Sequence, residues 1–86
     1  MARTIDRELV MDTLRVLKRS GEYLYPLDVL YTAVNGSRID PVQLSTFKDH
    51  VAHAEEKGWM EYRVDRIDGT KRWYITTAGE TALAKG

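Results

Sequence analysis

Residues 40–76 read DPVQLSTFKDHVAHAEEKGWMEYRVDRIDGTKRWYIT and carry most of the information about the architecture. The first half predicts a helix over residues 41–57, because Asp40 can act as the N-cap and Pro41 suits the first turn. Gly58 ends this helix. Its apolar side chains recur at helical spacing and are expected to face a core: Leu44, Phe47, Val51 and Ala54.

The second half, residues 59–76, predicts a β-hairpin. Asp68-Gly69 is typical of a two-residue type I′ turn. If these residues form the turn, Ile67 faces Thr70, and the pairs Val64–Trp73 and Tyr62–Ile75 follow. The alternation then places the apolar residues of the hairpin on one face: Met60, Tyr62, Val64, Trp73 and Ile75.

Three further helices flank this stretch. Residues 5–20 predict a helix that Thr4 caps and Gly21 ends, and residues 22–25 are long enough only for an edge strand. Pro26 begins a second helix over residues 26–35. Thr77 and Glu80 form a capping box that begins a short last helix over residues 78–85.

Length and composition indicate one small domain over residues 1–86. The chain has no cysteine, which excludes disulfides and thiolate metal sites. No apolar run is long enough to span a membrane and no signal peptide is visible, so we expect a cytoplasmic protein. The 13 basic and 13 acidic residues give no net charge, so any nucleic-acid site needs local positive charge.

The stretch from Gln43 to Met60 resembles the winged helix-turn-helix domains of bacterial and archaeal regulators, such as the MarR-like and PadR-like groups. It has a polar first turn, spaced apolar residues and an ending of the type apolar-Glu-Glu-x-Gly-apolar-apolar, although Ala54 stands where these groups usually have Leu. The ending from Ile75 to Gly79 resembles their strand-to-helix junction. The resemblance implies an α+β fold with a three-helix core, a two- to three-stranded antiparallel wing and a short C-terminal helix. It also implies sequence-specific binding of double-stranded DNA by a transcriptional regulator, with the third helix in the major groove and the wing on the backbone or minor groove.

Candidate DNA-binding residues lie on the third helix and on the wing. Short polar side chains can contact base edges or phosphates, and cations can neutralise phosphates. Arg66 and Lys71 are expected to stand opposite each other near the tip, where a phosphate would relieve their repulsion. Arg63 and Arg72 point to the other face, where Arg72 can pair with Asp65. The complete candidate set is Arg38, Gln43, Ser45, Thr46, Lys48, Asp49, His50, His53, Arg63, Arg66, Lys71 and Arg72.

Other functions have weaker support in the sequence. His50 and His53 are three residues apart on one helix, but a zinc site needs further ligands. Trp59, Trp73 and Tyr74 could form a base-stacking surface for single strands. No catalytic motif or phosphate-binding loop is present, so we expect neither an enzyme nor a cofactor.

Two partner hypotheses remain. A DNA-binding regulator is expected to form a homodimer through its first or last helix and to contact two half-sites. The alternative is a winged-helix module that binds a protein, which the zero net charge and the acidic end of the third helix favour.

Overall fold

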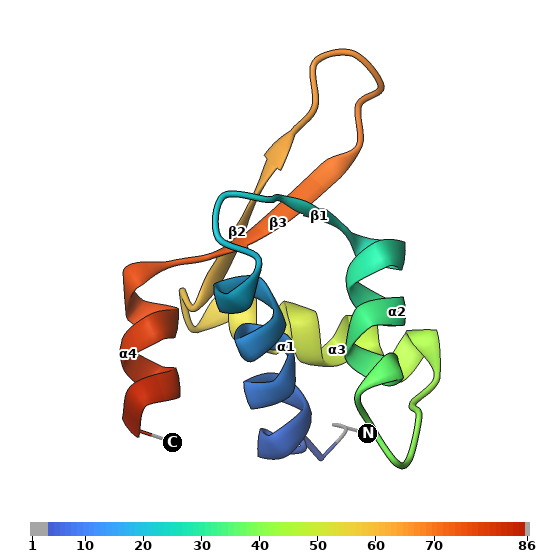
Figure 1. Cartoon of the computed structure of the whole chain (residues 1–86), viewed down its shortest axis with the longest axis vertical. Helices are drawn as coiled ribbons and strands as arrows, with labels where there is room; N and C mark the ends of the chain where they lie inside the picture. Colours follow the sequence, from blue (N-terminus) through green and yellow to red (C-terminus); the bar gives the residue numbers. More distant parts are fainter. Residues whose placement is uncertain (1–3, 86) are drawn as a thin grey trace.

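The computed structural model describes residues 4–85, which form four helices and a three-stranded sheet (Figure 1). The elements follow the order α1 (Arg7–Arg19), β1 (Tyr25–Pro26), α2 (Leu27–Gly36), α3 (Leu44–Glu56), β2 (Met60–Val64), β3 (Lys71–Ile75) and α4 (Thr77–Lys85). This is the expected α+β winged-helix-like fold with a C-terminal helix. None of the described helices has the length and apolar character that a bilayer crossing requires.

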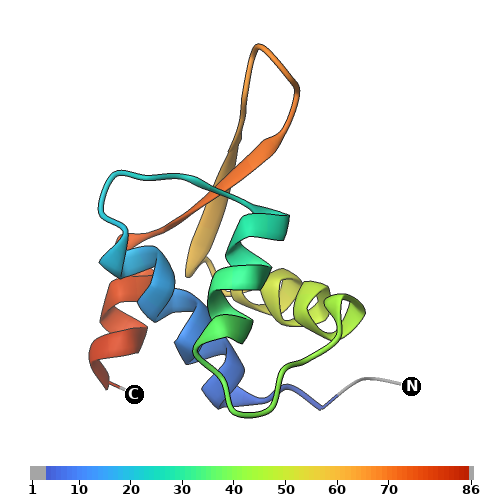
Figure 2. The same cartoon turned by 45° about the vertical axis from the view of Figure 1, so that its right-hand side comes forward.

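Helix α1 lies between α2 and α4 and also packs against α3 and β3 (Figure 1). The sheet has the order β1-β3-β2 with antiparallel neighbours. Its β2–β3 hairpin extends away from the helices, as both views show (Figure 2). The following side chains form the apolar core: Leu9, Val10, Met11, Leu14, Val16, Leu17, Leu30, Val34, Phe47, Val51, Ala54, Met60 and Trp73.

Helix α3 begins at Leu44, three residues later than predicted. The side chain of Asn35 accepts a hydrogen bond from the Val42 N–H at 3.0 Å and donates to the Val42 carbonyl at 3.1 Å. The Tyr31 hydroxyl also donates to this carbonyl at 2.7 Å. These contacts use the backbone groups of Val42 outside the helix, so the predicted start at Asp40-Pro41 is wrong. Leu44 is consequently 41% exposed and does not belong to the core.

The caps of α1 and α4 also differ from the predicted residues. Asp6, and not Thr4, caps α1, because its side chain accepts a hydrogen bond from the Glu8 N–H at 2.9 Å. The Thr76 hydroxyl, and not that of Thr77, accepts from the Gly79 N–H at 3.0 Å at the start of α4. Asp6 and Thr76 are the residues whose side-chain oxygens the path of the chain brings to the free N–H groups at the two helix starts.

The hairpin pairs two residues out of the predicted register. Tyr62 faces Trp73 and Val64 faces Lys71. The loop spans residues 66–69, and the Asp65 N–H closes it by donating to the Thr70 carbonyl at 2.8 Å. A type I′ turn needs positive φ at both central residues, whereas Gly69 has φ 72° and no described non-glycine residue has positive φ. Because the shift is an even number of residues, the predicted apolar face is retained.

Candidate nucleic-acid interface

The exposed side of α3 is polar and cationic at its start and acidic at its end. Gln43, Ser45 and Lys48 are exposed at its start, and Glu55 and Glu56 are exposed at its end. The opposite side is buried through Phe47, Val51 and Ala54, which hold the helix against the core. The first half of α3 therefore offers polar and cationic groups to a ligand, whereas the second half offers carboxylates.

Three other predicted residues of α3 lie at the edges of this surface. Thr46, Asp49 and His53 are half-buried. The ring of His53 meets the ring of Trp59 edge-on, with 6.2 Å between the ring centres. His53 is therefore held near the base of the hairpin, apart from the exposed residues at the start of the helix.

His50 does not face a ligand, contrary to the prediction. Its side chain is buried, with a relative exposure of 3%. Its Nε2 lies 2.9 Å from the Asp6 backbone N–H, and its Nδ1 lies 2.7 Å from the Thr46 carbonyl. The helical spacing predicts that His50 points outward, but the first residues of the α1 region pack against α3 and cover it. Within residues 4–85 there is no cluster of metal ligands that includes it.

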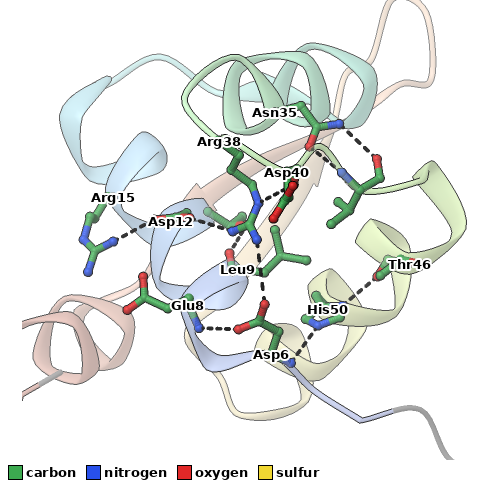
Figure 3. Close-up of polar contacts among 12 residues, drawn as sticks. Asp6, Glu8, Leu9, Asp12, Arg15, Asn35, Arg38, Asp40, Thr46 and His50 are labelled. Carbon is green, nitrogen blue, oxygen red and sulfur yellow. Dashed lines mark hydrogen bonds and ion pairs between the residues drawn. The ribbon is translucent and has the colours of Figure 1, made fainter.

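Arg38 is likewise occupied by contacts inside the protein (Figure 3). Its Nη1 lies 2.7 Å from an Asp12 carboxylate oxygen, and its Nη2 lies 3.7 Å from Asp6. Its Nε donates to the Asp40 carbonyl at 3.3 Å. The side chain is only 15% exposed and is paired with carboxylates, so the structure does not support Arg38 as an exposed phosphate contact, which stays an untested prediction. The carboxylate partners of Arg38, Asp6 and Asp12, were not predicted, because nothing in the local sequence links them to residue 38.

We call the β2–β3 hairpin (residues 60–75) the wing. Its cations differ in whether a carboxylate of the wing pairs with them. Arg72 pairs with Asp65 at 3.2 Å, as predicted, and also lies 3.7 Å from Asp68. Arg66 is exposed in the loop, and none of the described carboxylates forms an ion pair with it. Because the register is shifted, Arg66 does not stand opposite Lys71, and the predicted pair of like charges is wrong.

Two other wing cations lie over aromatic rings. Lys71 Nζ is 4.5 Å from the centre of the Tyr62 ring, and the Arg63 guanidinium is 5.4 Å from that of Tyr74. Such cation–π contacts orient the side chain and leave its charge in place. Arg63 faces Arg72 directly across the strands. Lys71 and Arg63 therefore remain exposed positive charges on opposite faces of the wing.

Hydrogen bonds shift two pKa values on the wing. The Thr70 N–H donates to the Asp68 carboxylate at 2.8 Å, which lowers the pKa of Asp68 below its ordinary value. The Tyr74 hydroxyl donates to Glu61 at 2.8 Å, which raises the pKa of Tyr74. Both groups are thereby held in their usual protonation states, with Asp68 charged and Tyr74 neutral.

The aromatic residues do not form a stacking surface. Trp73 is buried, with a relative exposure of 5%. Trp59 is half-buried next to His53, and the hydroxyl of Tyr74 is used by Glu61. The weakly supported alternative of a single-strand stacking surface is therefore not provided by these three residues.

Comparison with known proteins supports the fold. No family model matches the chain, and no curated protein matches it. Among solved structures, F-93 of SSV1 is 21% identical with a TM-score of 0.67, over 98% of this chain and 84% of that chain. TA0346 from Thermoplasma acidophilum, described as a candidate transcriptional regulator, is 20% identical with a TM-score of 0.67, over 95% of this chain and 81% of that chain. These likenesses show a winged-helix-like fold, and membership of the MarR-like or PadR-like groups stays a prediction.

Proposed function

We propose that this winged-helix-like domain binds double-stranded DNA as a small transcriptional regulator. The observation that carries the proposal is the exposed first half of α3, with Gln43, Ser45 and Lys48, on a molecule whose wing extends beyond its helices. The likeness to TA0346, which is described as a candidate regulator, is consistent with this function.

The major groove is wide enough for an α-helix, and it displays a distinct donor and acceptor pattern for each base pair. Gln43 and Ser45 can donate to and accept from base edges, and Lys48 can neutralise a phosphate. Glu55 and Glu56 would be repelled by phosphates if the second half of α3 entered. The charge distribution therefore favours entry by the first half of the helix.

The wing would contact the DNA backbone beside the groove. Arg66, Lys71 and Arg63 are its exposed cations, whereas the charges of Asp65 and Asp68 are partly balanced by Arg72. About three phosphate contacts by these wing groups alone would contribute a fall in affinity of about 40-fold between about 50 and about 200 mM salt. This moderate dependence agrees with a chain of zero net charge.

We further propose a homodimer, because two half-sites supply the affinity and specificity that one small domain lacks. Of the two predicted surfaces, α4 is the better candidate, since α1 is covered by its neighbours. Helix α4 borders an open hollow of about 250 Å³, which it lines together with Arg7 of α1 and with Trp59; the α4 residues are Ala78, Thr81, Ala82 and Lys85. Sedimentation velocity would test this, and a monomer at all concentrations would contradict it.

A protein partner is the second candidate function. One observation favours it: a groove of about 430 Å³ on α2 and β1, lined by Tyr25, Asp28, Val29, Thr32 and Ala33. Val29 is 40% exposed there, and exposed apolar side chains in a groove are typical of binding surfaces.

Fluorescence anisotropy with a labelled random duplex at two salt concentrations separates the two functions. We expect measurable DNA binding that weakens as the salt concentration rises. Lys48→Ala should lower the DNA affinity, whereas the control Lys18→Ala on α1 should leave it unchanged. No binding at low salt, or equal effects of both substitutions, would overturn the DNA function.

A further inference from the structure

His50 is buried on α3, and both of its ring nitrogens have partners (Figure 3). Nε2 lies 2.9 Å from the Asp6 backbone N–H, which can only donate, so Nε2 must accept. Nδ1 lies 2.7 Å from the Thr46 carbonyl, which can only accept, so Nδ1 must carry the proton. The two contacts together therefore require the neutral ring with its proton on Nδ1.

This ring joins the middle of α3 to the first residues of α1, 44 positions earlier in the chain. Asp6 is the N-cap of α1, and its carboxylate accepts from Glu8 and lies 3.7 Å from Arg38. Arg38 in turn binds Asp12. The charged groups linked to this contact are Asp6, Arg38 and Asp12, with Glu8 beside the N-cap. The charged or titratable neighbours of His50 along α3 are Lys48, Asp49 and His53.

We propose that His50 is a positioning residue that holds the DNA-reading half of α3 against the start of α1, and that a second proton on its ring releases this contact and weakens DNA binding. The proposal rests on the proposed function. A proton on Nε2 would place two N–H donors against each other at a buried site. The Asp6 contact must then break, whereas the Thr46 carbonyl still accepts from Nδ1. The part of α3 that carries Thr46 and Lys48, four and two positions before His50, thereby loses its hydrogen bond to the start of α1.

The direction of the pH effect distinguishes this mechanism from general electrostatics. In general electrostatics, a proton taken up at an exposed site adds positive charge to the protein and would strengthen DNA binding. Protonation of His50 would weaken it, although it also adds positive charge. Weaker binding at lower pH is therefore the signature of the His50 contact.

Two substitutions separate the two ring contacts. The side chain of His50→Gln places an acceptor near the position of Nε2 and cannot take up a proton. That of His50→Asn reaches only the position of Nδ1. Between about pH 8 and about pH 5, we expect the wild-type affinity to fall about tenfold. His50→Gln should bind like the wild type at pH 8 and lose this fall. His50→Asn should bind about tenfold more weakly throughout, and the control His53→Gln should keep the fall. Circular dichroism at each pH confirms that every variant compared is folded.

The results that would overturn the proposal are equally specific. A wild-type affinity that is constant or rises as the pH falls contradicts it, as do equal effects of the Gln and Asn substitutions. If the wild type binds no duplex at any pH, the proposed function fails, and ¹⁵N NMR decides the positioning role separately. An Nδ1–H ring with an exchange-protected Asp6 amide, and acid-induced shifts at Thr46 and Lys48, would support the role. An Nε2–H ring or an unprotected Asp6 amide would refute it.

Discussion

Replacing Gly79 with alanine should destabilise the domain, because this residue packs directly on the backbone of another element. Gly79 is buried near the start of α4. A Cβ atom added there would lie 2.0 Å from the Trp59 carbonyl oxygen and 2.8 Å from Cγ1 of Ile75. Both distances are shorter than van der Waals contact, so one of the two neighbours or α4 itself must move.

The loss of folding stability depends on which of these groups can move. The Ile75 side chain can rotate, but the Trp59 carbonyl accepts a hydrogen bond from the Thr76 N–H at 3.0 Å. Moving this carbonyl breaks a bond at the base of the wing, so the cost lies near the upper end of the about 1–3 kcal/mol that overpacking causes. The greater helix propensity of alanine returns about 0.5–1 kcal/mol. We therefore expect a net loss of about 2 kcal/mol, or roughly 10–15 °C in Tm for a domain of this size.

Urea unfolding followed by circular dichroism measures this change, and Gly36→Ala is the matched control. Gly36 ends α2, and no atom lies within 4 Å of the Cβ that the substitution adds. The control should therefore gain about 0.4–1 kcal/mol, because alanine reduces the freedom of the unfolded chain. The reasoning would be refuted if Gly79→Ala were as stable as the wild type or were stabilised like the control, because α4 would then not pack on Trp59 as described.

Three further predictions concern charged residues. Arg66→Ala should weaken DNA binding for all sequences and reduce the salt slope by about one, and an unchanged slope in anisotropy titrations would remove the wing tip from the interface. Arg38→Ala should lower the free energy of unfolding in urea by about 1–2 kcal/mol. This value is discounted because Asp12 is partly exposed and keeps its contact with Arg15, and Arg38→Lys should recover part of the loss. NMR titration should show a pKa for Asp68 below the ordinary value, because the Thr70 N–H donates to the carboxylate. The stabilisation from Asp68 is then complete above the unfolded pKa and is lost as the pH falls through the folded pKa, and a midpoint at or above the ordinary value would contradict the contact.

The positions of the helices and of the hairpin could be predicted because they depend on local spacing. The apolar period around Phe47 and Val51 indicates a helix in any context, and the alternation through Met60, Tyr62 and Trp73 indicates a strand pair. The element boundaries could not be predicted as well, because they depend on which of several possible hydrogen bonds the folded chain makes. The start of α3 depends on the hydrogen bonds between Asn35 in α2 and Val42 in the loop that follows.

The candidate site was predicted less completely than the fold. Ser45, Lys48 and Arg66 are exposed as expected, because helical periodicity and loop position predict exposure directly. Arg38 and His50 were assigned to DNA because a polar residue in a loop or at the border of a helix can equally face solvent or another element. Their actual partners, Asp12 and Asp6, lie 26 and 44 positions away.

The order of helices and strands, the apolar face of the wing and the polar start of the third helix follow from the amino-acid sequence, because neighbouring residues impose them. The hairpin register, the helix caps and the burial of His50 were decided by tertiary structure, because each depends on which of several possible donors and acceptors the folded chain brings within hydrogen-bond distance. Short-range steric and hydrophobic patterns repeat along the sequence and can be read there, whereas the choice of a hydrogen-bond partner leaves no periodic pattern, whether that partner is near, as for the Asp6 cap, or distant, as for His50.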